Sequence, residues 1–310
     1  MISNFFLTAI RNIRRNLSYT LLNVSGLTLG IAACIIIFLV VRNELSYDQY
    51  NSKANRTYRV TLNAIDFNPS VSMVITPNLR NDFPELEAVT QVWFQQEGVV
   101  KVGEQRYNEK QYCFVDENFM KVFDHQWLQG SSRSLSEPNT IVLTKSLAQK
   151  YFGNRDAMGQ VIKLDNQFDL KVAGIIKDPP PNTHLPFQFL VSFETVRKDI
   201  DPVKQHFYQI MGGFTYFVTP GHYDINKMQR QMPAFVARHW GADMAKEARL
   251  PLQPLTAIHY DTRYLHNPDM PTVSKDSYWA VAAVGLLILL IASINFINLS
   301  TVYLNFPFSF

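Results

Sequence analysis

Cysteine is almost absent from this chain, and its scarcity limits how the fold can be stabilised. The 310 residues contain two cysteines, Cys34 in a long apolar run and Cys113 in a polar stretch. Two cysteines in such different surroundings are not expected to pair, so the chain has no disulfide framework. Any folded domain must therefore be stabilised by its hydrophobic core alone.

Motifs for metal binding and nucleophilic catalysis are also missing. None of the seven histidines stands in H-E-x-x-H, no cysteine pair accompanies them, and no serine stands in G-x-S-x-G. The stretch from Gly153 to Gly159 has one residue too many between its glycines for a phosphate-binding loop, and Gln160 stands where that motif needs lysine. We interpret it as a turn, and we expect no enzyme activity, catalytic residue, metal site or cofactor in this chain.

Several isolated polar residues have a simple structural interpretation. We interpret His259 and His266 as solvated loop residues, because a polar loop separates them. We expect the following acidic side chains to be solvated or to cap helices: Asp116, Glu117, Glu194 and Asp199.

Concentrated positive charge is missing as well. The net charge is +3, and the 29 Lys and Arg residues are scattered rather than clustered among aromatic ones. Nucleic-acid binding needs such a basic patch. We therefore expect no nucleic-acid partner.

Charge is wholly absent from residues 21–41, an apolar run that begins at Leu21 and ends at Val41. At a rise of 1.5 Å per residue, about 21 residues cross a hydrocarbon core of ~30 Å. Each Leu, Ile, Val or Phe favours insertion by about 0.3–0.6 kcal/mol, and no charged side chain opposes it. The run predicts a first transmembrane helix.

Arginines and no acidic residue precede this run. Arg11, Arg14 and Arg15 lie opposite the apolar positions of a helical pattern, so residues 1–20 predict an interfacial helix anchored on the cytoplasmic side. A cleaved signal peptide is the alternative. Its apolar region would be shorter and would end in small residues, whereas this run ends in Val-Val-Arg.

A second apolar run covers residues 278–299 and begins with Tyr278 and Trp279, as aromatic residues do at membrane interfaces. It predicts a returning helix, which makes residues 42–277 periplasmic and residues 300–310 a cytoplasmic tail. We expect a multi-pass protein of a bacterial inner membrane, in contact with the lipid bilayer and with its main domain in the periplasm.

Both runs carry small residues that permit close helix packing. Gly26 and Gly30 form a G-x-x-x-G, and the second run contains Ala282, Ala283 and Gly285. The general enrichment of small residues in membrane helices explains them equally well.

Residues 42–277 alternate short strands and helices, which predicts an α+β domain without the regular βαβ order of a doubly wound sheet. The clearest unit is a helix from Lys145 to Phe152, with Thr144 as its N-cap and Gly153 as a left-handed C-cap. The remaining pattern predicts strands at 56–65, 88–94, 187–193 and 213–219 and hairpins over 99–115 and 160–176. It predicts further helices from Thr76, over 118–123 and over 224–240. Residues 177–186 are expected to form an exposed proline-rich connection, and residues 250–260 an extended segment.

Particular stretches of the chain are more distinctive than this general pattern. Residues 141–153 read Ile-Val-Leu-Thr-Lys-Ser-Leu-Ala-Gln-Lys-Tyr-Phe-Gly and are followed by Asp156 and Gly159. Together with the stretches 9–16, 23–30, 115–123, 182–189, 252–259 and 292–301, they resemble the MacB/FtsX-type ABC transporter permeases, in particular their MacB-like periplasmic core domain.

The resemblance implies the N-terminal part of a permease subunit. In that family a separate cytoplasmic ATPase binds and hydrolyses ATP and thereby changes the conformation of the periplasmic domain. The resemblance implies export or extrusion of a small molecule, a peptide or a lipoprotein. Its implied partners are the ATPase in the full-length form, a second permease copy in a dimer, and periplasmic or outer-membrane components; ATP would bind to the partner.

The resemblance also implies an α+β periplasmic domain of two lobes flanked by two transmembrane α-helices. One lobe would comprise residues 53–96 and 188–260, and an inserted lobe residues 97–187. The motif residues with an implied structural role are Thr144, Tyr151, Phe152, Gly153, Asp156 and Gly159. Since the family continues after the second span as a basic segment and Val302–Phe310 carries no positive charge, we expect a chain truncated after that span or with an altered end.

Two other functions share this layout. An extracytoplasmic sensor also has a domain between two spans, but it should continue into a helical signalling segment. A two-span scaffold that binds other envelope proteins is likewise compatible with the sequence.

The predicted topology can be tested by cysteine labelling. In a variant without Cys34 and Cys113, a cysteine placed at Lys150 should react with a membrane-impermeant maleimide added to cells with a permeabilised outer membrane. A cysteine at Ser18 should react only after the inner membrane is broken. Protection of position 150 in intact cells would contradict the predicted orientation.

Overall fold

The computed structural model describes residues 17–199, 213–264 and 272–305. The chain forms two compact units, one made of its first and last segments up to Ser46 and from Ser274, and the other made of Tyr47–Val273. The expected anchoring residues Arg11, Arg14 and Arg15 lie outside the described residues, as does His266.

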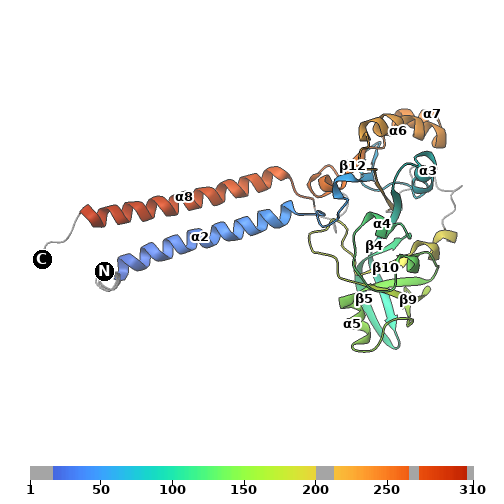
Figure 1. The fold of residues 1–310 in the computed structure, drawn as a ribbon, viewed down its shortest axis with the longest axis horizontal. Helices are drawn as coiled ribbons and strands as arrows, with labels where there is room; N and C mark the ends of the chain where they lie inside the picture. Colours follow the sequence, from blue (N-terminus) through green and yellow to red (C-terminus); the bar gives the residue numbers. More distant parts are fainter. Residues whose placement is uncertain (1–16, 200–212, 265–271, 306–310) are drawn as a thin grey trace. The chain divides into compact units, whose positions relative to one another are not determined.

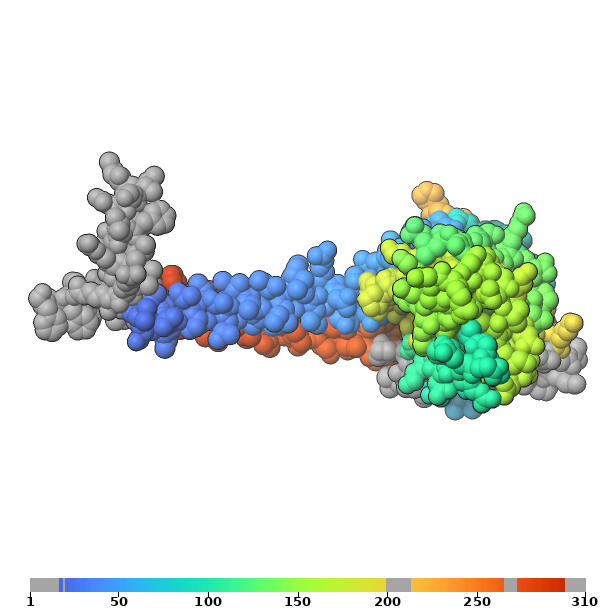
Figure 2. Space-filling view, turned by 90° about the horizontal axis from the view of Figure 1, so that it is seen from below, coloured from blue at the N-terminus to red at the C-terminus, as the bar shows by residue number. Residues whose placement is uncertain are grey.

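The first unit contains two long apolar helices, α2 (Leu17–Leu45) and α8 (Lys275–Asn305). Within them, Thr20–Leu45 and Lys275–Asn298 are long and apolar enough to cross a membrane, and almost none of their side chains are buried. The predicted spans 21–41 and 278–299 fall inside these helices. Figure 2 shows α2, in blue, and α8, in orange-red, side by side along their length.

The second unit is built on one mixed sheet with the strand order β12-β1-β11-β4-β5-β10-β7-β9-β6, in which β8 also pairs with β4 and β9. The strands of this sheet are β1 (Thr57–Val60), β4 (Ala88–Val102), β5 (Gln105–Val115), β6 (Trp127–Gln129), β7 (Thr140–Thr144), β8 (Val161–Leu164), β9 (Phe168–Ile176), β10 (Phe189–Ser192), β11 (Gly213–Val218) and β12 (Leu252–Pro254). A separate pair is formed by β2 (Leu62–Asn63) and β3 (Phe67–Asn68).

Long antiparallel pairing of β4 with β5 forms the centre of the sheet. Val102 pairs with Gln105, so the turn has two residues and places Gly103 at a positive φ of 58°. Such tight hairpin turns require positive φ, which glycine adopts without steric cost. The predicted hairpin is confirmed, and the strand predicted at 88–94 is the first half of the same β4.

Helices pack on the sheet through separate apolar clusters. Buried side chains of α3 (Ile75–Asp82) and α6 (Ile225–Trp240) pack with those of β1, β4 and β11, while α5 (Lys145–Phe152) packs with residues of β5, β7, β8, β9 and β10. The short α4 (Phe119–Val122) belongs to a third cluster beside β4 and β11, and α7 (Ala242–Glu247) follows α6. Figure 1 shows α5 at the opposite end of this unit from α6 and α7.

The expected α+β architecture with two flanking apolar helices is confirmed. The predicted helix 145–152 has the bounds expected for it, and Thr144 caps it by accepting a hydrogen bond from Leu147 N. The predicted boundary between the two lobes at residue 96 falls inside β4, and the sheet continues through both predicted lobes. The division into lobes stays a prediction.

Three sequence-based boundaries were wrong. The strand predicted at 56–65 is interrupted at Thr61: β1 ends at Val60, and the following β2 pairs with β3 while Asn63 also bridges to Arg249. The segment 250–260 is extended only to Pro254 and then forms a 3₁₀ helix, η5 (Leu255–Tyr260). Helix α3 begins at Ile75 rather than after Thr76, whose hydroxyl lies 2.8 Å from that of Thr215 instead of capping the helix.

Candidate functional site

The two apolar helices contact each other closely at one of the predicted glycines. A Cβ at Gly30 would lie 2.7 Å from the Cβ of Ala292, closer than real Cβ atoms approach. The Cys34 thiol donates to Gly285 O at 3.1 Å, and a Cβ at Gly285 would lie 3.2 Å from Ile37. Small residues therefore allow the two helix backbones to approach closely.

The other predicted small residues contribute less to this contact. A Cβ at Gly26 would meet only the Asn295 amide, at 3.9 Å. Ala282 is half-buried, whereas Ala283 is exposed. Beside Gly26 and Gly30 runs an apolar groove of about 610 Å³ that also contains Asn295 and Asn298.

Each motif residue around α5 has a local structural contact. Tyr151 and Phe152 are buried, and the Tyr151 ring lies 4.9 Å from that of Tyr107. Burial raises the pKa of the Tyr151 hydroxyl, and the nearby Glu109 carboxylate raises it further. These contacts hold α5 against β5.

The turn after α5 contains the remaining motif residues. Gly153 has the expected positive φ of 61°, but its ψ of −123° places it outside the left-handed helical region. Asp156 Oδ1 accepts from Met158 N at 3.0 Å, and Gly159, with φ of 76°, donates from its N to Val172 O at 2.8 Å. An open hollow of about 460 Å³ lies between this turn, α5 and β6.

A buried carboxylate stands at the point where the chain enters the sheet domain. Asp48 is 1% exposed and has a positive φ of 60°. Its Oδ1 accepts from the Thr183 hydroxyl at 3.2 Å and from His184 N at 3.1 Å, and its own N donates to Asn182 O at 2.9 Å. A buried carboxylate is costly unless it is hydrogen-bonded, so these bonds fix the segment after α2 to residues 182–184.

His184 extends these contacts into the sheet. Its Nδ1 lies 2.8 Å from Asp48 Oδ1, and its Nε2 lies 2.8 Å from the hydroxyl of Tyr216 on β11. Tyr50 contacts the Thr183 hydroxyl at 3.2 Å, and burial raises the pKa of Tyr50 to about 12. Burial also raises the pKa of Tyr216.

The segments through which the chain enters and leaves the domain both contact His259. Tyr47 stacks on His259 with ring centroids 3.5 Å apart and an interplanar angle of 4°. Val273 N donates to His259 O at 2.9 Å. Both covalent connections of the domain, through Tyr47 and through Val273, therefore contact one residue of η5. We call Tyr47, Asp48, Tyr50, Thr183, His184, Tyr216 and His259 the junction cluster.

The junction cluster overturns two sequence-based interpretations. His259 is 4% exposed and not solvated, because Tyr47 covers its ring. The connection 177–186 is exposed only in its first half, since Thr183, His184 and Leu185 are buried around Asp48. No local pattern indicated these contacts, because Asp48 lies more than a hundred residues away from its partners.

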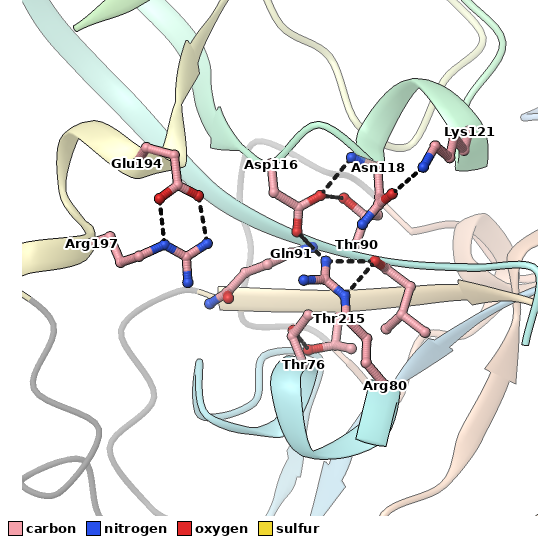
Figure 3. A network of polar contacts seen from close by, with 11 residues as sticks. Thr76, Arg80, Thr90, Gln91, Asp116, Asn118, Lys121, Glu194, Arg197 and Thr215 are labelled. Carbon is pink, nitrogen blue, oxygen red and sulfur yellow. Dashed lines mark hydrogen bonds and ion pairs between the residues drawn. The ribbon is translucent and has the colours of Figure 1, made fainter. Parts of the chain in front are cut away.

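Asp116 is a second buried carboxylate, at the end of β5 (Figure 3). Its Oδ1 accepts from the Thr90 hydroxyl and from the N of Asn118, the residue that precedes α4, and its Oδ2 accepts from Arg80 and from Gln91 N. The expectation of a solvated or helix-capping side chain was wrong, because Asp116 is buried and the N-cap residue of α4 is Asn118. Glu194 forms a bidentate pair with Arg197.

Among residues 17–199, 213–264 and 272–305, no group of three His, Cys, Asp or Glu side chains could hold a metal ion. Most of the junction cluster is buried, and Tyr47 and Tyr50 are half-buried.

Residues 20–234 match the family described as MacB-like periplasmic core domain. The chain belongs to this family. The match confirms the resemblance to MacB-like permeases, and it covers the first apolar helix and most of the sheet domain. No curated protein matches the sequence.

One solved structure shares the fold of this MacB-like domain at low sequence identity, and two others have lower similarity. A domain of a protein described as a permease, from Porphyromonas gingivalis, has a TM-score of 0.57 and 18% identity, covering 66% of this chain and 92% of that one. The periplasmic region of MacB from Actinobacillus actinomycetemcomitans has a TM-score of 0.47 and 13% identity, covering 64% and 89%. The extracellular domain of the noncanonic ABC-type transporter YknZ from Gram-positive bacteria has a TM-score of 0.45 and 13% identity, covering 62% and 99%.

Two stretches that carried the resemblance to this family meet in the junction cluster. Residues 182–189 supply Thr183 and His184, and residues 252–259 supply His259. In the structure these two stretches therefore lie in the same cluster, which their sequence alone did not indicate.

Enlarging Gly30 should separate the two apolar helices. In membranes, Cys34 should cross-link under mild oxidation to a cysteine placed at Gly285, whose nearest neighbour is the flexible Ile37 side chain. Gly30→Val should reduce this cross-link several-fold, because its Cβ would clash with Ala292. Thr28→Val, at an exposed position two residues before Gly30, serves as the control and should leave the yield unchanged. Equal yields in both variants would contradict the helix contact.

His125 should make the stability of the domain depend on pH. Its ring stacks on Phe119, and burial lowers its pKa to about 4, against the opposing effect of Asp124. Between about pH 6.5 and pH 4 the unfolded chain binds a proton that the folded chain does not, so the free energy of unfolding falls as pH falls. Since part of the ring reaches the surface, we expect a loss of about 2 kcal/mol between pH 7 and pH 4.5 from this residue.

His125→Phe should remove this part of the pH dependence. Urea unfolding of the parent and the variant in detergent, followed by tryptophan fluorescence at both pH values, measures the difference. Parallel pH dependence of the two proteins would contradict the assignment.

Proposed function

We propose that this chain is the N-terminal part of the permease subunit of an ABC transporter, with α2 and α8 crossing the inner membrane and the sheet domain in the periplasm. The observation that carries the proposal is the family match over residues 20–234, combined with apolar helices on both sides of the domain. A separate cytoplasmic ATPase would supply ATP binding and hydrolysis.

In this proposal the junction cluster transmits motion of the membrane helices to the sheet. Tyr47 follows α2 closely in sequence, and Val273 precedes α8, so a displacement of either helix acts on these residues first. Both contact His259, and Asp48 connects through His184 to Tyr216 on β11. Separating two buried, hydrogen-bonded partners costs free energy because a polar group is left unsatisfied. Such partners therefore move together, and a displacement of one is transmitted to the other.

The proposed transport is export or extrusion of a small molecule, a peptide or a lipoprotein. A second permease copy and periplasmic or outer-membrane components are the further proposed partners. A sensor or scaffold shares the same layout, but the family match favours the permease.

Copurification tests the proposal. The longest product of the gene, tagged and extracted from native membranes in mild detergent, should retain an ABC ATPase. A product ending at Phe310 should retain much less, because the resemblance places the ATPase-contacting segment after Thr301. Asp48→Asn in the longer product should leave the recovery unchanged, since Asp48 lies in the sheet domain.

Recovery of a sensor kinase or of no ATPase by the longer product would overturn the permease assignment. Equal ATPase recovery by both products would overturn only the placement of the docking segment.

A further inference from the structure

The side chain of Gln91 is buried with an unused donor. Gln91 lies on β4 opposite Thr215 of β11 and is 5% exposed. Its main-chain N donates to Asp116, but its side-chain Nε2 makes no hydrogen bond with the described residues. Buried polar groups without a partner are rare in folded proteins, so this one calls for an explanation.

Two arginines contribute further unused donors beside Gln91. Arg80 donates from Nε and Nη2 to Val89 O and from Nη2 to Asp116, and Arg197 donates from Nε and Nη2 to Glu194. Neither Nη1 donates a hydrogen bond to any residue that the structure describes. Figure 3 shows the Gln91 carboxamide extending toward the Arg197 guanidinium, with Arg80 on its other side.

The carboxylates of this network are already occupied. Both oxygens of Asp116 accept two hydrogen bonds each, and both oxygens of Glu194 accept from Arg197. The hydrogen bonds from Arg197 to Glu194 raise the pKa of Arg197, and the charges of Glu194 and Asp116 raise it further. The charged groups left over at this site are therefore the two arginine Nη1 donors.

The two arginine side chains remain accessible from solvent. The side chain of Arg80 is 33% exposed and that of Arg197 is 52% exposed, whereas Gln91 lies at the buried end. We propose that Gln91 Nε2, Arg80 Nη1 and Arg197 Nη1 form a binding site for a carboxylate group. A carboxylate has two oxygens in one plane, which suits guanidinium donors on either side of an amide donor.

The site goes beyond the proposed permease function and does not depend on it. The carboxylate could belong to a free small acid or to an acidic side chain of a peptide. Binding assays with succinate and with a capped Ala-Asp-Ala peptide distinguish the two sources.

Calorimetric titration of the purified full chain in detergent measures this binding. At least one of the two carboxylate probes should bind, whereas succinamide, which has the same shape without charge, should not. Arg197→Gln should weaken binding by about tenfold or more, the loss of one charge-assisted hydrogen bond. Arg263→Gln is the matched control, because Arg263 forms the same bidentate pair with Asp261 elsewhere in the domain, and it should leave the affinity unchanged.

Gln91→Glu tests the site without any ligand. It replaces the amide donor with a carboxylate beside the two arginine donors, so it should raise the melting temperature by a few degrees and abolish binding of the probes. A lower melting temperature for Gln91→Glu would overturn the proposal. Absence of binding by both probes, or equal affinity of Arg197→Gln and the parent, would also overturn it.

Discussion

Two buried carboxylates determine how the loops and helices of the domain are attached to its sheet. A carboxylate removed from water must be hydrogen-bonded, and it therefore dictates the position of every group that donates to it. Asp116 receives donors from α3, β4 and the start of α4, and so fixes those elements together. Asp48 receives donors from residues 183 and 184 and so fixes the segment that follows α2.

The two units of the chain are stabilised by different forces. The sheet domain buries apolar clusters against α3, α5 and α6 in the manner of a water-soluble protein. The helices α2 and α8 leave nearly all of their apolar side chains exposed, which is stable only when lipid surrounds them. Their mutual contact consequently depends on close approach at Gly30 and Gly285, because lipid provides no hydrophobic drive for helix association.

Local elements could be predicted wherever the signal was local. Helix α5, its Thr144 cap and the β4–β5 hairpin follow from side-chain periodicity and turn residues, and the structure confirms them. The failures have a common cause. Thr76, His259 and the second half of 177–186 were assigned from their neighbours in sequence, but their environment is set by Thr215, Tyr47 and Asp48.

The sequence by itself determined the two apolar helices, the α+β class and the family, because hydrophobicity, periodicity and motif order are properties of contiguous residues. Only the tertiary structure decided that Asp48, His184 and His259 form one junction and that Gln91 lies between Arg80 and Arg197. Those groups come from strands and loops far apart in the chain. Their proximity depends on the order of strands in the sheet, which no local pattern specifies.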